Sequence, residues 1–127
     1  MVERHSSASP YETTVGFSRA VRVGRRIVVA GTAPIGPDGR TVEGDALVQA
    51  RRCLEIILTA VASLGGRREH VVRTRMYLVD AADQELVGRA HGEVFAAVRP
   101  AATMVVVKEL LDPRWRVEIE AEAELEP

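Results

Sequence analysis

Residues 115–124 alternate without exception between apolar and charged side chains, and this pattern constrains the fold more than any other stretch of the chain. The apolar positions are Trp115, Val117, Ile119, Ala121 and Ala123, and the charged positions are Arg116, Glu118, Glu120, Glu122 and Glu124. Successive side chains of a strand point to opposite faces of a sheet. The pattern therefore predicts a strand over about residues 114–125, with an apolar face that other elements must cover.

Two segments have the periodicity of amphipathic helices and can cover this apolar face. The first spans about residues 46–64 and follows Asp45, whose side chain can cap the helix. The second begins after Asp80 or Asp83 and extends to about Val98. In both segments apolar side chains recur at intervals of three and four residues, which gives each helix one buried stripe.

The remaining apolar runs predict four more strands, at about residues 17–23, 26–31, 71–80 and 104–110. Gly24-Arg25 joins the first two strands as a tight hairpin. The predicted order is ββαβαββ, an α+β fold in which two helices back a mostly antiparallel sheet. Strand edges rich in valine and isoleucine tend to pair with other chains when they are left uncovered, so we expect the chain to associate with other copies of itself.

The length of the chain, 127 residues, suffices for one domain and is too short for two ordinary ones. Residues 1–12 are polar and contain the run Ser-Ser-Ala-Ser-Pro. We therefore expect a flexible N-terminus over residues 1–12, followed by a single domain over residues 13–127.

The charge balance argues against two classes of partner. Seventeen basic and eighteen acidic residues leave a formal charge of −1, so no large electrostatic attraction favours nucleic acid or an anionic membrane. The apolar runs are too short to span a bilayer, and the first residues lack the apolar core of a secretion signal. The single cysteine, Cys53, allows no internal disulfide and suits a reducing compartment. We expect a cytoplasmic protein with no nucleic-acid partner and no membrane partner.

A metal centre has one fragment in its favour, His91-Gly92-Glu93, which matches the first half of a zinc-deaminase signature. The second half requires Pro-Cys-x-x-Cys, whereas the sole cysteine lies upstream. Because the soft ligands are missing, we expect no metal site and interpret His91 as a residue of the helix surface.

The glutamates of the last strand have two interpretations that the sequence leaves open. In the first, they form a solvated or salt-bridged sheet face opposite Arg19, Arg22, Arg73 and Arg75 on neighbouring strands. In the second, one glutamate holds a water molecule or shuttles a proton, with its pKa raised by partial burial at an interface.

Four strings of the sequence, taken in order, resemble the Rid family of reactive-intermediate deaminases, which also bears the older label endoribonuclease L-PSP. They are "FSRAVRVGRRIVVAGTAPIGPDG", "VVRTRMYLVD", "RPAATMVVVKELLDP" and "VEIEAEA". The similarity extends from about Phe17 to Ala123. It implies a chorismate-mutase-like fold, a homotrimer, and a small-molecule pocket at each interface between subunits.

The resemblance also implies a chemistry, the hydrolysis of imines and enamines derived from amino acids, with release of ammonia and without a metal or cofactor. In such proteins an arginine in a Pro-Ala-Arg-Ser/Thr string binds the substrate carboxylate. Here Pro100 and Ala101 agree with that string and Thr103 falls on its Ser/Thr position, but Ala102 stands where the arginine belongs. By this correspondence Thr103 would donate a hydrogen bond to the substrate or to water.

Three further positions of the implied pocket can be carried over. Phe17 takes the place of the usual tyrosine, Gly31 matches the glycine whose backbone lines the pocket, and either Glu118 or Glu120 matches the glutamate that positions water. The resemblance thus implies Glu118, Glu120 and Thr103 as catalytic candidates. It implies Phe17, Gly31, Ala102 and Thr103 as substrate-binding candidates.

The missing arginine is expected to change the substrate. A charge-assisted hydrogen bond contributes about 1.5–3 kcal/mol, and a loss of about 3 kcal/mol lowers transition-state binding roughly a hundredfold. An α-imino acid should therefore bind poorly, unless Arg75 or Arg99 supplies a replacement cation. The sequence leaves three functions open: a C–N hydrolase of altered specificity, a non-catalytic ligand-binding or regulatory module, and a ribonuclease. The near-neutral charge and the aromatic content of 4% disfavour the ribonuclease.

Overall fold

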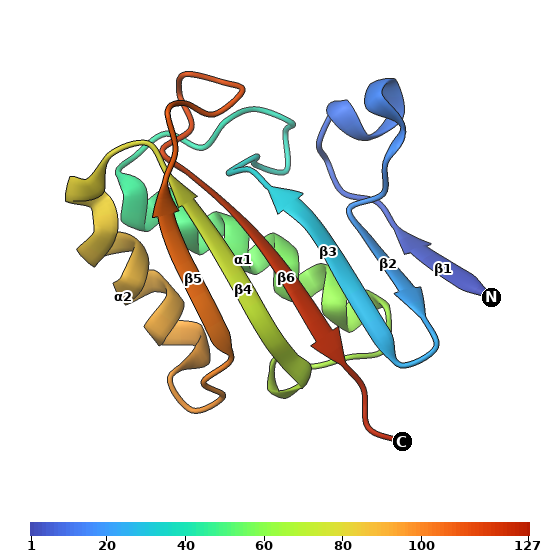
Figure 1. The fold of residues 1–127 in the computed structure, drawn as a ribbon. Helices are drawn as coiled ribbons and strands as arrows, with labels where there is room; N and C mark the ends of the chain where they lie inside the picture. Colours follow the sequence, from blue (N-terminus) through green and yellow to red (C-terminus); the bar gives the residue numbers. More distant parts are fainter.

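The computed structural model describes residues 1–127, which form a six-stranded sheet with two α-helices packed against one of its faces (Figure 1). The strands are β1 (Val2–His5), β2 (Ala20–Val23), β3 (Arg26–Thr32), β4 (Val71–Leu78), β5 (Ala101–Val106) and β6 (Val117–Glu124). The α-helices are α1 (Ala46–Ser63) and α2 (Gln84–Phe95), and the short helical turns are η1 (Glu12–Gly16), η2 (Arg68–His70) and η3 (Ala81–Asp83). The strand order is β1-β2-β3-β6-β4-β5, and only the β4–β5 pair is parallel.

This arrangement confirms the predicted α+β class, and from β2 onward the elements follow the predicted order ββαβαββ. The alternating stretch forms β6, which lies between β3 and β4 and begins at Val117 rather than at residue 114. Its apolar side chains at positions 117, 119, 121 and 123 are at most 2% exposed. The alternation therefore predicted correctly which face of the last strand the helices cover.

The N-terminus departs from the expectation of a flexible segment over residues 1–12. Val2–His5 form the edge strand β1, which pairs antiparallel with β2. The sheet therefore includes residues that precede position 13, where we expected the domain to begin. Hydrogen bonds fix the polar run that follows. The backbone N–H and the hydroxyl of Ser7 both donate to the buried Glu12 carboxylate. Strand pairing with β2 and hydrogen bonds to Glu12 thus order a segment whose composition is typical of a loose terminus.

The ends of several elements differ from the predicted ones by a few residues. Asp45 caps α1 as predicted, since its carboxylate accepts a hydrogen bond from the Val48 amide at 3.0 Å. Helix α2 ends at Phe95 instead of Val98, and Arg99 adopts a positive φ of 57° just before β5 begins. The hairpin between β2 and β3 is confirmed.

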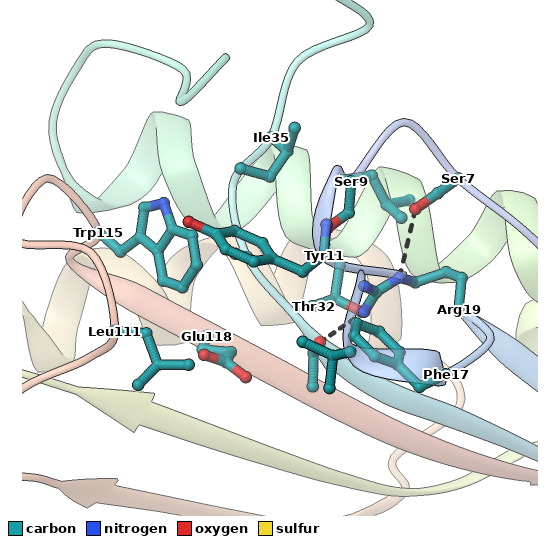
Figure 2. Close-up of a pocket in the computed structure, with 14 residues that line it drawn as sticks. Ser7, Ser9, Tyr11, Phe17, Arg19, Thr32, Ile35, Leu111, Trp115 and Glu118 are labelled. Atoms are coloured by element: carbon teal, nitrogen blue, oxygen red, sulfur yellow. Dashed lines mark hydrogen bonds between the residues drawn. The ribbon is translucent and has the colours of Figure 1, made fainter. Parts of the chain in front are cut away.

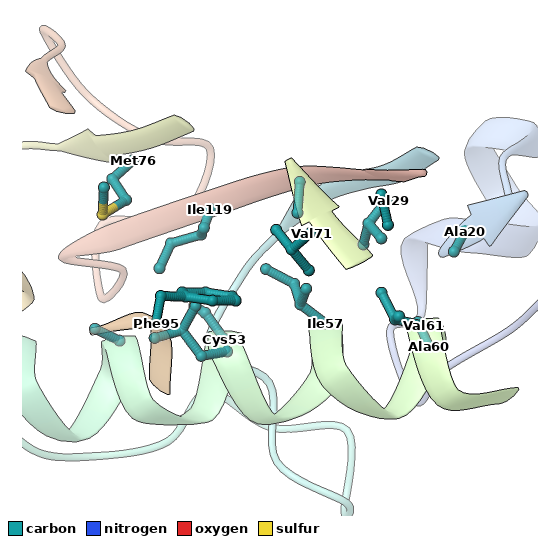
Figure 3. Close-up of a cluster of buried hydrophobic side chains, with 14 of the residues drawn as sticks. Ala20, Val29, Cys53, Ile57, Ala60, Val61, Val71, Met76, Phe95 and Ile119 are labelled. Atoms are coloured by element: carbon teal, nitrogen blue, oxygen red, sulfur yellow. The ribbon is translucent and has the colours of Figure 1, made fainter. Parts of the chain in front are cut away.

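The hydrophobic core fills the space between the sheet and the two helices (Figure 3). Phe95 from α2, Ile57 from α1 and Ile119 from β6 meet there, and each is at most 1% exposed. Cys53 lies in the same core, where burial raises the pKa of its thiol, so it acts as a small apolar side chain. Neither helix combines the length and the apolar character that crossing a membrane requires.

Candidate functional site

An irregularity in β3 creates the site. Val29 pairs with Ala121 of β6 and Thr32 pairs with Ile119, so β3 has one more residue than β6 over this interval. Such bulges occur frequently beside active sites, because they change the direction of nearby side chains. Here the bulge contains Gly31, which lies directly against the side chain of Glu118 on β6.

A cavity of about 150 Å³ opens beside this bulge, between the N-terminal segment, β3 and the start of β6 (Figure 2). Its walls are mostly apolar, and they include Tyr11, Val15, Phe17, Ile35, Leu111 and Trp115. The rings of Tyr11 and Trp115 meet edge to face with their centroids 6.1 Å apart. Segments that are far apart in the sequence therefore enclose one small apolar space.

Glu118 is the acidic side chain of this cavity, and it makes no hydrogen bond within the chain. Burial raises the pKa of its carboxyl above the usual value, and the attraction of Arg19 opposes that shift in part. A carboxyl with a raised pKa and free oxygens is suited to accept a proton from a bound molecule.

The neighbouring glutamates of β6 behave differently, and this separates the two interpretations of the row. Glu120 accepts a hydrogen bond from the Tyr77 hydroxyl and lies 3.5 Å from Arg75. Glu122 pairs with Arg26 and Arg75. These two residues form the salt-bridged sheet face, whereas Glu118 alone enters the cavity.

Arg19, which the sequence analysis placed only among the arginines opposite the glutamates of the last strand, is the cation of the cavity. Its side chain is only 4% exposed and lies 3.5 Å from the equally buried carboxylate of Glu12. It also donates to the Gly31 carbonyl and to the Thr32 hydroxyl, and its guanidinium carbon lies 5.2 Å from the centroid of the Phe17 ring. Burial lowers its pKa, while Glu12 and Glu118 act in the opposite direction. The one signal in the sequence was its spacing of two residues from Phe17.

The structure brings together Phe17, Gly31 and Glu118, but it places Ala102 and Thr103 elsewhere. Both lie exposed on β5 at the edge of the sheet, and β4 separates them from β6. Thr103 is in register with Arg75, which in turn is in register with Glu120. Within one chain, then, the predicted site residues form two groups.

Neither proposed replacement cation reaches the cavity of its own chain. Arg75 is engaged by the glutamates of β6, and Arg99 is an exposed residue between α2 and β5. His91 is half-buried instead of lying on the helix surface. It forms a 2.8 Å hydrogen bond with Thr74, its ring packs on Phe95, and burial lowers its pKa. No group of three or more potential metal ligands occurs in the structure.

The contact between Gly31 and Glu118 predicts a selective effect of one methyl group. A Cβ at position 31 would lie 2.2 Å from Oε2 of Glu118, so Gly31→Ala must displace the carboxylate. Any activity that depends on the position of this carboxylate should fall about 100-fold, while the unfolding free energy changes by less than about 1 kcal/mol. The control is Gly92→Ala, since a Cβ at Gly92 meets nothing within 4 Å. Assays of both variants would contradict this account if Gly31→Ala kept full activity.

The raised pKa of Glu118 predicts how stability depends on pH. A carboxyl that is harder to ionise in the folded chain destabilises the fold once the pH exceeds its unfolded pKa, near 4.5. Glu118→Gln removes this penalty, so the variant should gain stability over the parent as the pH rises from about 4 to about 8. Urea unfolding of both proteins across this range measures the difference, and a gap that shrinks with rising pH would show that the carboxyl is not destabilised by burial.

Comparisons with known proteins agree with this geometry. The family model described as "Endoribonuclease L-PSP" matches residues 7–125. An uncharacterised protein of Streptomyces coelicolor is 42% identical over 122 residues, which cover 96% of this chain and 91% of that protein. A RutC family protein of Pyrococcus abyssi is 35% identical over 95 residues, covering 74% of this chain and 75% of its own length.

A solved structure shows the same fold. It is that of a Mycobacterium tuberculosis protein described as a member of the YjgF/YER057c/UK114 family, with a TM-score of 0.89 and 39% identity. The alignment covers 98% of this chain and 100% of that one. This likeness confirms the chorismate-mutase-like fold that the resemblance implied.

Proposed function

The chain belongs to the endoribonuclease L-PSP family, also called the Rid or YjgF family, and on this premise we propose that it hydrolyses a C–N bond of a small molecule in the cavity beside Glu118. The observation that supports the proposal most directly is the state of Glu118. It is a partly buried carboxyl with no partner in the chain, set against apolar walls. A base of this kind works best when its pKa is shifted toward the working pH.

The proposed reaction needs only this base and water. Glu118 takes a proton from a water molecule as the water oxygen bonds to the carbon of a C=N group. The carboxyl returns this proton to the nitrogen, which gives a carbinolamine. Glu118 then transfers the hydroxyl proton of the carbinolamine to the nitrogen as the C–N bond breaks, so that ammonia or an amine leaves and the carbon becomes a carbonyl. The apolar walls keep other water away from the reacting group, which strengthens the interaction with the carboxylate.

A homotrimer is part of the proposal, because it would join the two groups of site residues. Glu118, Gly31 and Phe17 line the cavity of one copy, whereas Thr103 and Ala102 lie on the exposed edge strand β5. Exposed apolar side chains occur on both surfaces, including Val106 on β5 and Leu111 at the cavity. An edge strand of one copy packed beside the cavity of the next would cover these side chains and bring Thr103 near the site. We also propose a cytoplasmic location.

The test is a measurement of ammonia released from a panel of imines and enamines, some with and some without a carboxylate, beside the rate without protein. Acceleration of at least one compound, with loss of that acceleration in Glu118→Gln, would support the proposal. Rates at background across the whole panel would refute it. Sedimentation velocity of the same preparation tests the trimer, which a purely monomeric protein would contradict.

A non-catalytic ligand-binding module is the second candidate, and Ala102 favours it because the family's carboxylate-binding arginine is absent at that position. This function predicts thermal stabilisation by a ligand without turnover. We do not propose RNA cleavage, because Arg26 and Arg75 on the helix-free sheet face pair with glutamates of β6, which offsets the positive charge that a phosphate backbone would need.

A further inference from the structure

The carboxyl of Glu118 and the guanidinium of Arg19 both border the cavity (Figure 2). The first accepts hydrogen bonds and the second donates them, but the two groups do not bond to each other. All hydrogen bonds of the Arg19 side chain use Nε and Nη1, which donate to the hydroxyls of Ser7 and Thr32 and to the carbonyls of Ala30 and Gly31. Its Nη2 donates to no protein atom, although the side chain is only 4% exposed. No buried side-chain nitrogen or oxygen lacks a partner in the structure, so Nη2 keeps contact with the open space of the cavity. A donor and an acceptor without partners in the chain therefore border one small space.

The charges around this space disfavour a charged ligand. The cation of Arg19 is already balanced by Glu12, whose Oε2 lies 3.5 Å from Nε and whose side chain is 5% exposed. A ligand carboxylate would add a third carboxyl group to Glu12 and Glu118, with one guanidinium to serve all three. An ammonium ion could pair with Glu118, but it would lie near the positive charge of Arg19 and would give the guanidinium no acceptor. Burying a carboxylate without a free cation, or a cation close to another cation, is costly.

The size of the space suits a ligand of a few heavy atoms. The cavity measures about 150 Å³, and an apolar cavity of about 150 Å³ is known to accept benzene. Tyr11, Phe17 and Trp115 supply flat apolar walls on which a ring can pack.

We propose that the cavity recognises a compact uncharged molecule whose C=O group accepts a hydrogen bond from Arg19 and whose N–H group donates one to Glu118, as in an amide, lactam or urea. Carboxylates and ammonium ions are excluded. This inference names the ligand class of the proposed site and so rests on the proposed function, but it concerns binding and requires no turnover.

The test uses four probes of similar size that differ in polar groups, with binding followed by amide chemical-shift changes in the ¹⁵N-labelled protein. 2-Pyrrolidinone carries donor and acceptor, cyclopentanone carries the acceptor alone, pyrrolidinium is a cation, and cyclobutanecarboxylate is an anion. We expect 2-pyrrolidinone to bind at least about tenfold more tightly than each of the others. Compared with cyclopentanone it makes one additional charge-assisted hydrogen bond, from its N–H group to Glu118. The amide signals of Phe17 and Gly31 should shift.

Glu118→Leu removes the acceptor while keeping an apolar wall, so the preference for 2-pyrrolidinone over cyclopentanone should fall below about twofold. The matched control is Glu124→Leu, at an exposed position of the same strand outside the cavity, which should keep the full preference. Tighter binding of the anion, equal binding of all four probes, or binding of none would each overturn the inference.

The two proposals fail in distinguishable ways. If 2-pyrrolidinone binds as described and no imine or enamine is hydrolysed, the ligand class stands and the catalytic proposal is refuted. If imines that carry a carboxylate are hydrolysed faster than uncharged ones, the catalytic proposal stands and the ligand class is refuted.

Discussion

Replacing Glu118 by glutamine should lower the rate of C–N bond hydrolysis about 10²–10⁴-fold, the usual contribution of a positioned general base. Glutamine keeps the size of the side chain and an acceptor oxygen, but it cannot take up a proton. The loss should therefore appear in kcat, with little change in KM. Steady-state kinetics on the best compound of the imine and enamine panel measure both constants.

The control for this result is the variant Glu120→Gln. Glu120 lies on the same strand face two residues away, but its carboxylate is engaged by Tyr77 and Arg75 outside the cavity. We expect its replacement to change kcat less than about threefold. An equal loss in both variants would mean that the whole row, and not Glu118 alone, carries the reaction.

Replacing Arg19 by methionine should destabilise the protein by about 3–5 kcal/mol, the cost of removing one partner from a buried ion pair. Methionine keeps much of the volume, so the loss comes mainly from the Glu12 carboxylate and from the Gly31 and Thr32 oxygens that lose their donor. Urea unfolding measures this loss as a lower midpoint.

Two further variants show whether the unpaired carboxylate of Glu12 causes the loss of stability in Arg19→Met. The double variant Arg19→Met/Glu12→Gln should recover part of the stability, because glutamine is neutral and can still bond to Ser7. Arg51→Met breaks an ion pair with Glu93 in which both side chains are exposed, and it should leave the midpoint nearly unchanged. If Arg19→Met unfolded at the midpoint of the parent, the buried pair would have no structural role.

The sequence was most informative where one strand or helix determines its own pattern. The alternation in β6 and the apolar stripes of α1 and α2 each follow from a local period, so the α+β class and the helix-covered face could be predicted. Strand β1 could not, because Val2–His5 form a strand only through pairing with β2. The end of α2 was placed too late since Pro100 marks only the last residue at which a helix can stop.

The site shows a similar division. The resemblance implied Phe17, Gly31 and Glu118 as site residues. It could not separate Glu118 from Glu120, because the two glutamates lie on the same strand and the same face. What separates them is the bulge in β3, which no local pattern reveals. Arg19 was missed because a charged side chain is ordinarily expected at the surface. Its burial depends on Glu12 and on carbonyls that approach only in the folded chain.

The position of β6 has a consequence for how the protein is made. This strand contains residues 117–124, yet it lies in the middle of the sheet and joins β3 to β4 (Figure 1). A nascent chain that has not released these residues from the ribosome holds two separate sheet fragments, β1-β2-β3 and β4-β5, with no strand between them. Closure must wait for contacts between residues far apart in sequence, which are slow to form. Since Glu118 enters with the same strand, the cavity acquires its carboxyl in the step that joins the two sheet fragments.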